Sequence, residues 1–366
     1  MKWRPALCCF LCAAALSAAA QKEYRVTVLH SFRVPFEESF GRAIGDGQQV
    51  GDNNSLQTGG GSHAMLWSGT PESLIDLHPK GWSASFMTGV IGGRQSGFVE
   101  PGDGRVFAAL WSGSADSMVL LHPKGWDNSQ LLGLSLTDQV GWVNQSRDFR
   151  LAARWQGTPE SMVLLHPGGP YLGSWVNDTD GEVQVGQAAI GQIRPALWRG
   201  SRESFVDLTP PGFSGGEVYG VANGQQAGWV GGPGGAQAAI WHGSAETFVN
   251  LNPAGFGSRL FDTNGTQQVG RIAQGIGTSW AAAWSGTAES MLNLHQFLPA
   301  QFRGSGEFSI AYGIDAGGNI IGYARDLQAD RAGRAVMWSP VPEPGTVVGL
   351  ATLLTLLATR RRAKTR

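Results

Sequence analysis

The chain has 366 residues, including 54 glycines and 14 tryptophans, and only 15% of its residues are charged. This aromatic content is too high for a disordered chain, and a mean hydropathy of -0.12 excludes a bundle of membrane helices. Abundant glycine and aromatic residues with few charges favour short strands joined by tight turns.

The chain begins with a sequence typical of a secretory signal peptide. Two basic residues within the first four positions precede an apolar stretch over residues 6–16, and small residues follow up to Ala20. We expect cleavage after Ala20, so that residues 1–20 form the leader. A lipoprotein signal is the alternative, and it fits less well because Leu11 rather than a small residue precedes Cys12. All cysteines lie in this leader, so the mature chain is predicted to contain no disulfide.

Residues 21–340 contain one unit written seven times. A tryptophan recurs every 43 or 44 residues, except for a last step of 54, and a glycine that ends a Gln-rich or apolar run recurs with it. The tryptophans are Trp67, Trp111, Trp155, Trp198, Trp241, Trp284 and Trp338, and the glycines are Gly51, Gly97, Gly141, Gly186, Gly228, Gly270 and Gly322. We expect the tryptophans to pack between neighbouring units as large apolar plates.

Each unit predicts four short β-strands, as residues 217–253 illustrate. Strands are expected over 218–222, 225–230, 237–241 and 248–251, with a tight Asn-Gly turn between the first two. Four strands in about 44 residues, repeated seven times, are typical of β-propeller blades. The sequence therefore predicts an all-β, seven-bladed propeller in which the first strand of each unit lines a central channel.

The two ends of the array complement each other. The seventh unit stops after its third strand, at residue 338, whereas residues 24–30 match the fourth strand of the other units. We expect the N-terminal strand to complete the last blade and close the ring, because this pairing removes two open sheet edges.

The units also resemble the extracellular HAF repeat family. The His-Ala-Phe element that gives the family its name is matched best by residues 63–67, and the turn and following strand by residues 47–51. The resemblance implies an extracellular repeat protein, and the family has no agreed biochemical activity.

Residues 341–366 combine three features in a fixed order. A Pro-Glu-Pro motif is followed by an apolar stretch over 346–359 and then by a basic end; the motif is Pro342, Glu343 and Pro344, and the basic end includes Arg360, Arg361 and Arg362. The stretch is predicted to form a helix of about 21 Å, with the basic end held in the cytoplasm. A plain single-span anchor is the alternative.

This tail resembles the PEP-CTERM sorting signal of Gram-negative bacteria. The resemblance implies processing by an exosortase, a transient membrane anchor, and export to the cell surface or beyond, often alongside exopolysaccharide. Without the leader and tail, 20 basic residues remain against 27 acidic ones, a net charge of about −7. This charge argues against nucleic acid, or an anionic polymer, as a non-specific partner.

Two kinds of titratable residue recur at equivalent places in the units. Because equivalent positions in a ring lie far apart, we expect polar turns rather than a metal site or an acid–base pair, and we expect no cofactor. The histidines are His30, His78, His122, His166 and His295, and the acids are Glu72, Asp116, Glu160, Glu203, Glu246 and Glu289. Residues 178–181 and 262–265 match part of a calcium loop, but its terminal glutamate is absent, so turns are expected there too.

The longest connections flank the seventh and first units and are predicted to lie on one face of the ring. Long loops on a rigid scaffold are common binding sites, so we expect a polar contact site there. Its residues are Asp52, Asn53, Asn54, Gln301, Arg303, Arg325, Asp326, Asp330 and Arg331. The alternative is that these are insertions tolerated beside the closure of the ring.

The sequence predicts an exported binding or scaffold protein of the cell surface or extracellular matrix, without enzymatic activity. It contains no nucleophile elbow, phosphate loop or HExxH motif. The expected partners are an exopolysaccharide or another envelope protein. One alternative is a polysaccharide lyase or glycosidase with its site at the channel mouth, for which the inner strands offer only Arg42, Glu217 and Asp262. Another alternative is a structural spacer.

Overall fold

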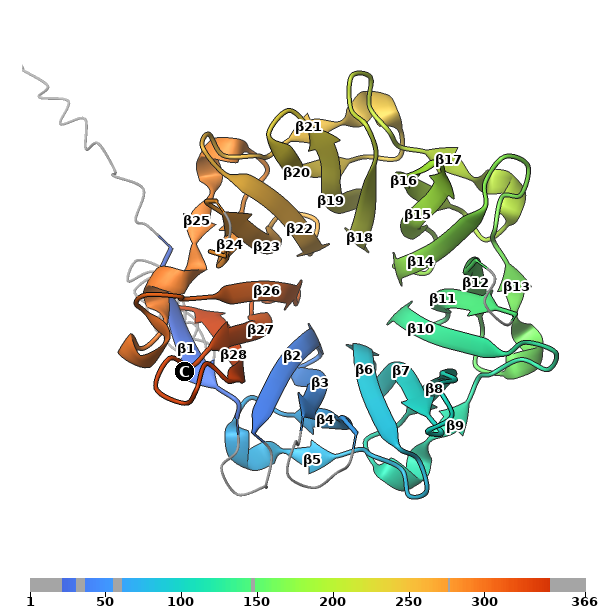
Figure 1. The fold of residues 1–366 in the computed structure, drawn as a ribbon, viewed down its shortest axis with the longest axis horizontal. Coiled ribbons are helices and arrows are strands. Elements are labelled where there is room, and N and C mark those ends of the chain that lie inside the picture. The colour runs from blue at the N-terminus through green and yellow to red at the C-terminus, as the bar shows by residue number, and fades with distance from the viewer. Residues whose placement is uncertain (1–21, 31–36, 55–60, 146–148, 276, 343–366) are drawn as a thin grey trace, which may run out of the picture. The chain divides into compact units, whose positions relative to one another are not determined.

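The computed structural model describes residues 22–30, 37–54, 61–145, 149–275 and 277–342. Residues Tyr24–Ser339 form one compact unit, and the chain ends, Met1–Glu23 and Pro340–Arg366, are assigned to a second. The predicted all-β, seven-bladed propeller is confirmed, because seven four-stranded antiparallel sheets surround a common centre (Figure 1). The expected C-terminal helix lies outside the described residues. Within the described ranges, no helix is long and apolar enough to cross a membrane.

Six blades are formed by four strands that are consecutive in the chain. Blade 1 contains β2 (Glu38–Gly45), β3 (Gln48–Asn54), β4 (His63–Trp67) and β5 (Ile75–Asp76), and blade 2 contains β6 (Ala84–Ile91), β7 (Arg94–Glu100), β8 (Phe107–Trp111) and β9 (Val119–Leu120). Blade 3 contains β10 (Asn128–Leu134), β11 (Gln139–Asn144), β12 (Leu151–Trp155) and β13 (Val163–Leu164), and blade 4 contains β14 (Gly173–Thr179), β15 (Gln184–Ile190), β16 (Gln192–Trp198) and β17 (Val206–Asp207). Blade 5 contains β18 (Gly216–Ala222), β19 (Gln225–Gly232), β20 (Gly235–Trp241) and β21 (Val249–Asn250), and blade 6 contains β22 (Gly257–Thr263), β23 (Gln268–Ala273), β24 (Trp280–Trp284) and β25 (Leu292–Asn293).

Blade 7 combines strands from both ends of the array. Its strand order is β1-β28-β27-β26, with β26 (Ser309–Ile314), β27 (Ile320–Arg325), β28 (Gly333–Pro340) and β1 (Tyr24–Val28). Just beyond β1, the amide of Leu29 donates to the carbonyl of Ala335 at 2.8 Å. Seven equivalent first strands thus face the centre of the ring, namely β2, β6, β10, β14, β18, β22 and β26 (Figure 1).

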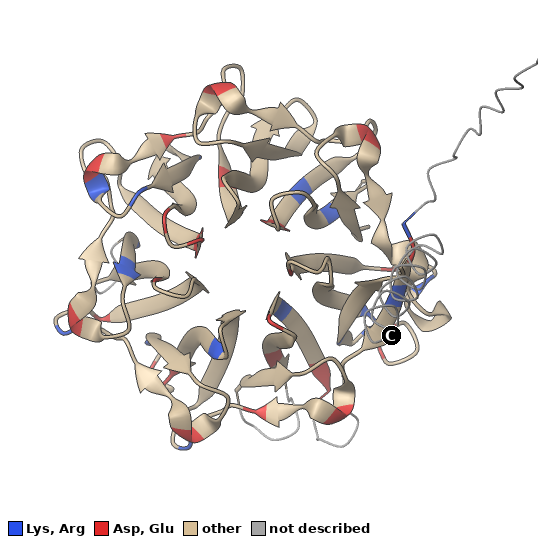
Figure 2. Ribbon diagram, turned by 180° about the vertical axis from the view of Figure 1, so that it is seen from behind, with Lys and Arg blue, Asp and Glu red and all other residues tan. Residues whose placement is uncertain are grey.

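The recurring acids lie on short 3-10 turns between the third and fourth strands. These turns are η1 (Pro71–Ser73), η2 (Ala115–Ser117), η3 (Pro159–Ser161), η4 (Arg202–Ser204), η5 (Ala245–Thr247) and η6 (Ala288–Ser290), while η7 (Leu294–Phe297) and η8 (Ala300–Phe302) follow β25. Each acid sits in the first turn of its element, and Figure 2 shows acidic positions spread around the outer edge of the ring. They are therefore turn residues on separate blades and do not form an acid–base pair.

The seven repeated tryptophans form the apolar contacts between blades, as predicted. All seven are less than 2% exposed. Trp111 of blade 2 packs in one cluster with Val50, Leu66 and Leu77 of blade 1, and its indole N–H donates to the Leu77 carbonyl at 3.0 Å. Burying a side chain of this size contributes several kcal/mol, so these contacts hold neighbouring blades together.

Each recurring histidine joins its own blade to the next through a serine. In blade 2, His122 Nδ1 lies 2.8 Å from Ser129 Oγ of blade 3, and that oxygen accepts the Ala108 amide at 3.0 Å. Because the hydroxyl oxygen already accepts, its hydrogen is left to donate to a neutral imidazole. Four further pairs share this geometry: His30 with Ser39, His78 with Ser85, His166 with Ser174, and His295 with Ser309. Asn252 replaces the histidine between blades 5 and 6 and accepts from Ser258 at 2.5 Å.

We predict that these histidines make the propeller sensitive to acid. Burial lowers the pKa of His78, His122, His166 and His295, and it lowers the pKa of His30 to about 4. The folded state favours the neutral imidazole. This preference contributes to the free energy of unfolding in full above the pKa of an unfolded histidine, about 6.5. The contribution is lost as the pH falls through the lower pKa of the folded state. The free energy of unfolding should therefore decrease below about pH 6.5.

The substitution His122→Asn tests this prediction, because Asn252 fills the equivalent position without a titrating group. At pH 7 the variant should match the parent within about 1 kcal/mol, the size of one hydrogen bond. Between pH 7 and pH 5 it should lose less stability in denaturant titrations. An equal loss in both proteins would contradict the prediction.

Candidate functional site

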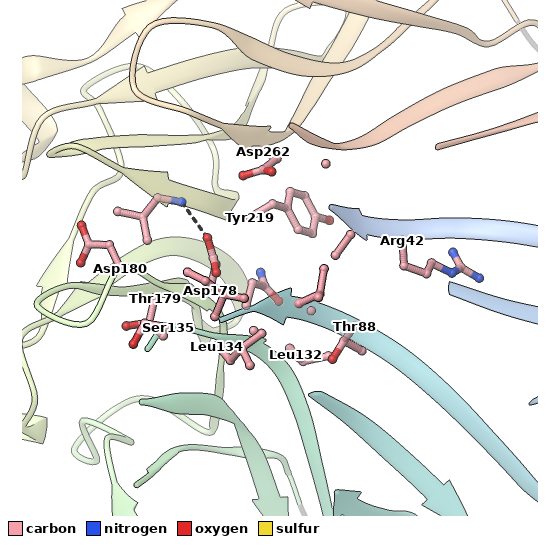
Figure 3. Close-up of a pocket in the computed structure, with 18 of the residues that line it drawn as sticks. Arg42, Thr88, Leu132, Leu134, Ser135, Asp178, Thr179, Asp180, Tyr219 and Asp262 are labelled. Atoms are coloured by element: carbon pink, nitrogen blue, oxygen red, sulfur yellow. Dashed lines mark hydrogen bonds between the residues drawn. The ribbon is translucent and has the colours of Figure 1, made fainter. Parts of the chain in front are cut away.

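The centre of the ring encloses a cavity of about 1140 Å³. Side chains from the first strands of neighbouring blades line it, including Arg42, Thr88, Leu132, Tyr219 and Tyr312. Figure 3 shows Asp178, Asp262 and Tyr219 entering this cavity from three neighbouring strands. Since the repeated residues form the blades, the residues that differ between blades give the cavity its chemistry.

Two aspartates in the cavity wall each accept an amide from the following blade. Asp178 Oδ2 accepts the Val221 N–H at 3.0 Å, and Asp262 Oδ2 accepts the Ile314 N–H at 2.9 Å. Burial raises the pKa of Asp178, and the neighbouring Asp262 raises it further. Burial also raises the pKa of Asp262, to about 7. The cavity therefore holds two carboxyl groups that keep a proton more readily than ordinary aspartates.

These aspartates occupy the position that follows a β-bulge in the first strand of every blade. The other blades have small residues there, namely Ala43, Gly89, Gly133, Gly220 and Gly313. A Cβ atom on Gly133 would lie 2.9 Å from Asp178 Oδ1, and one on Gly220 would lie 2.7 Å from Asp262 Oδ1. The same Cβ atoms would lie 2.7 Å from the Cα atoms of Asp178 and Asp262, so glycine in the preceding blade allows the two strands to approach closely.

A chain of aromatic rings crosses the inner strands of blades 5, 6, 7 and 1, and we call it the aromatic arc. The ring centroids are 5.2 Å apart for Tyr219–Phe261, 5.2 Å for Phe261–Tyr312, 6.0 Å for Tyr312–Tyr323, 5.8 Å for Tyr323–Phe308 and 5.0 Å for Tyr323–Phe40. All six side chains are half-buried, unlike the buried repeated tryptophans. The arc contains three of the five tyrosines of the protein.

Arginines stack on aromatic rings along these inner strands. Arg42 lies 5.3 Å from the ring centroid of Phe40 and 5.4 Å from that of Tyr312, and it pairs with Asp52 at 2.8 Å. On other blades, Arg150 lies over Trp142 and Trp175, Arg259 over Trp229, and Arg325 over Phe308. Stacking fixes the plane of a guanidinium and leaves the N–H groups at its edge available as donors.

Glu217 is a buried carboxylate beside the arc. Its Oε1 accepts the Trp175 indole N–H at 3.1 Å and the Asn177 side-chain amide at 2.9 Å. Burial raises the pKa of Glu217, and the hydrogen bonds from Asn177, Tyr219 and Trp175 oppose that rise. Glu217 therefore fixes the orientation of two aromatic side chains in the channel wall.

The structure brings together part of the predicted loop site. Gln301 Nε2 lies 3.4 Å from Asp326 Oδ2, and the Leu327 amide donates to the Gln301 carbonyl at 2.9 Å, so the two long connections of blade 7 contact each other. Arg325 Nη1 reaches the Gly306 carbonyl at 3.5 Å. Arg303, Asp330 and Arg331 are exposed near this region of the chain, with Asp330 and Arg331 at φ angles of 53° and 62°.

Blade 1 contributes its predicted residues differently. Asp52 is buried and bound to Arg42 on the inner strands, and the Asn53 side chain accepts the His63 amide at 3.1 Å. Asn54 is half-buried at the end of β3. Asp52 is therefore a residue of the channel wall, whereas Gln301 and Asp326 lie in the contact between loops.

The two calcium-loop matches are turns in which side chains bind the backbone. Asp180 Oδ1 accepts the amides of Glu182 and Val183, and Asn264 Oδ1 accepts those of Thr266 and Gln267. Within the part of the chain that is described, no three His, Cys, Asp or Glu side chains are grouped closely enough to hold a metal ion.

Sequence reasoning identified Arg42, Glu217 and Asp262 but missed the residues around them. Asp178 was interpreted only as part of a turn, and Arg259, Arg271 and the tyrosines of the arc were not selected. The sequence does carry a signal for these residues. Each of them occupies a position on the first or second strand of its unit where the other units have a different type of residue. Aligning the seven units and looking for positions that differ would therefore have identified these channel residues.

Comparison with known proteins supports the fold and leaves the family open. No family model and no curated protein matches the sequence. Among solved structures, prolyl oligopeptidase B from Galerina marginata is similar with a TM-score of 0.53 at 10% identity, over 84% of this chain and 51% of that one. Acylaminoacyl peptidase from Pyrococcus horikoshii has a TM-score of 0.52 at 8% identity, over 87% and 56%. The propeller domain of the Trilobed protease from Pyrococcus furiosus has a TM-score of 0.50 at 8% identity, over 84% and 98%.

These similarities correct one prediction from the sequence. We expected a protein without enzymatic activity because its repeats contain no catalytic motif, and that prediction is wrong: the solved structures that share the propeller are peptidases. The chain spans about half the length of these two proteins. At such low identity the similarity extends to the fold alone, so any chemistry has to be argued from the residues of this channel.

We predict that Asp262→Asn alters the pH dependence of stability. Because the pKa of Asp262 is raised to about 7 in the folded state, the folded protein binds a proton at this group more readily than the unfolded chain does. The contribution of Asp262 to the free energy of unfolding is therefore present at low pH and is lost as the pH rises from about 4 through 7. The asparagine oxygen can still accept the Ile314 amide but carries no charge. At pH 8 the variant should be more stable than the parent by about 1 kcal/mol or more, the equivalent of one pKa unit.

Denaturant titrations of both proteins at pH 4 and pH 8 test this expectation. Asp116→Asn provides a control, because Asp116 is exposed on the outer turn η2. If the parent and Asp262→Asn show the same difference at both pH values, the carboxyl group does not titrate as described.

Proposed function

We propose that this protein is an exported binding protein of the bacterial envelope that holds a polysaccharide at the aromatic arc. The arc is the observation that carries the proposal. Sugar rings present flat C–H faces that pack on aromatic rings, and their hydroxyl groups bind charged and amide side chains. Arg42, Asp52 and Asn177 provide such groups within the same cavity lining.

The placement of the arc supports binding over a purely structural role. Residues that hold the blades together recur in every unit and are fully buried, as Trp198 and Trp241 are. Tyr219, Phe261 and Tyr312 of the arc are instead half-buried and line the cavity, and Tyr323 stacks on Tyr312. Half-buried aromatic rings beside a large cavity offer a ligand apolar area that the fold itself has not used.

The proposal includes the export route implied by the sequence. The leader would direct the chain across the inner membrane, and the tail from residue 341 would anchor it until an exosortase-type enzyme processes it. An exopolysaccharide or another envelope protein would then be the partner at the cell surface or in the extracellular matrix. The loop residues Gln301, Arg325 and Asp326 would extend the site for a longer ligand.

A propeller enzyme that cleaves polysaccharide is the second candidate, and Asp178 and Asp262 favour it. A carboxyl group that keeps its proton near neutral pH can act as a general acid toward a glycosidic oxygen. Both groups reach the same cavity, next to Tyr219 of the arc (Figure 3). A lyase or glycosidase would thus use the same binding site.

Binding to a glycan array with the purified protein tests the proposed function. Tyr312→Ala should weaken the binding of any retained glycan by about tenfold, which corresponds to about 1.4 kcal/mol. Tyr171→Ala is the matched control, because Tyr171 is also half-buried but packs on Phe205 away from the cavity lining. Incubation of the bound glycan should be followed by mass spectrometry, since shortening of the chain would assign the enzyme function.

Two outcomes would reject polysaccharide binding at the arc. One is the absence of any retained glycan, and the other is equal binding by the parent and Tyr312→Ala while Tyr171→Ala behaves in the same way. Thermal unfolding of each variant shows whether a loss reflects the site or the fold.

The export proposal has its own test in the natural host. Replacing Pro342, Glu343 and Pro344 by alanine should leave unprocessed protein in the inner-membrane fraction. The parent protein should instead reach the surface or medium with a mature C-terminus close to residue 341. Equal processing of both proteins, measured by cell fractionation and mass spectrometry, would contradict exosortase sorting.

A further inference from the structure

Two arginines stand side by side on the inner strands of blade 6. Arg259 on β22 and Arg271 on β23 are direct partners across the antiparallel pair, so their side chains project from the same face of the sheet. Both are half-buried. Opposed like charges destabilise a sheet pair, and the cost is larger where water is partly excluded.

The protein does not neutralise this pair with a direct ion pair. Across the described ranges, no carboxylate oxygen lies within 4.0 Å of either guanidinium, although Arg42, Arg105, Arg154, Arg194, Arg202 and Arg334 each have such a partner. Glu217 acts on Arg259 electrostatically, but its carboxylate is held by Trp175 and Asn177. Burial and the charge of Arg259 lower the pKa of Arg271.

Arg259 is also held by an aromatic ring, and the pair lies next to the aromatic arc. The Arg259 guanidinium stacks 4.1 Å from the ring centroid of Trp229. Phe261, two residues further along β22, is part of the arc and lines the cavity. Arg259 interacts electrostatically with Tyr219 of the arc. Arg271 interacts electrostatically with the arc tyrosines Tyr219, Tyr312 and Tyr323.

We infer that Arg259 and Arg271 form a subsite for the carboxylate of an acidic sugar, so that the polysaccharide bound at the arc contains uronate residues. This inference rests on the proposed function and specifies its ligand class. A carboxylate accepts two N–H donors from a guanidinium in a planar arrangement, and a second cation beside it adds to the attraction. The neighbouring arc would pack against the apolar face of the same sugar ring.

Because the mature chain is negatively charged overall, an anionic ligand needs a local positive group such as this arginine pair in order to bind. At about −7 the protein repels anionic polymers at long range, as the sequence indicates. Charge-assisted hydrogen bonds act only within the site, where screening by salt is reduced. The inference therefore predicts selective binding of uronates at this site rather than general adhesion to anions.

The experiment compares acidic probes with their neutral esters on the full-length protein. The probes are oligogalacturonate and alginate oligomers, each with its fully methyl-esterified form and with a sulfated galactan oligomer. The parent should bind at least one uronate oligomer at least tenfold more tightly than its ester. Arg271→Gln and Arg259→Gln should each remove most of this difference, whereas Arg271→Lys should retain part of it because it keeps the charge.

Arg202→Gln is the matched control, because Arg202 is an exposed arginine on the outer turn η4. It should leave all affinities unchanged, and thermal unfolding shows whether each variant is folded. Preference for the sulfated oligomer over both uronates would overturn the carboxylate assignment. Equal binding of acid and ester that still depends on Tyr312 would overturn the inference and leave the proposed function intact. Binding of none of the oligomers, combined with an empty glycan array, would reject both.

Discussion

Contact between neighbouring blades is the constraint on which the rest of this structure depends. A four-stranded blade has two faces and cannot bury either one alone, so each blade relies on its neighbours. The repeated tryptophan supplies the apolar part of this contact, as Trp111 does against Leu77. The histidine–serine pairs supply a polar part, as His122 and Ser129 do. Both recur because each interface presents the same packing problem.

The repetition of these contacts leaves the inner wall free to vary. The repeated tryptophans and the histidine–serine pairs join the blades at each interface, so the residues facing the channel can differ from blade to blade. Asp178 and Asp262 therefore stand where the other blades have glycine or alanine, and Gly133 and Gly220 of the preceding blades allow the close approach of the two strands. The same freedom allows tyrosine and arginine to gather on blades 5, 6, 7 and 1 without altering the scaffold.

The channel combines charges that a fully buried core would exclude. Arg42 has a carboxylate partner in Asp52. Arg259 and Arg271 are adjacent cations, and of these two Arg259 lies over Trp229 and interacts electrostatically with Glu217. Burial raises the pKa of Asp178 and of Asp262, so these carboxyl groups lose their protons less readily than exposed aspartates. Such arrangements cost stability, and proteins commonly tolerate them where a ligand supplies the missing partner. The peptidases that share this propeller show that the scaffold itself is compatible with catalytic proteins.

The sequence alone determined the number of blades and the strand pattern. The spacing of the repeated tryptophans and glycines can be measured along the chain without knowing which distant residues meet. It also indicated that the recurring histidines and acids lie apart on separate blades, although the histidines contact serines of the next blade instead of serving only as turn residues. Only the tertiary structure decided which varying residues meet. Tyr219 and Tyr323 lie more than a hundred positions apart in the chain, and they join one arc because the inner strands of the consecutive blades 5, 6 and 7 pack side by side. The pairing of Arg259 with Arg271 likewise depended on the strand register, which a bulge shifts by one residue and the repeat pattern does not reveal.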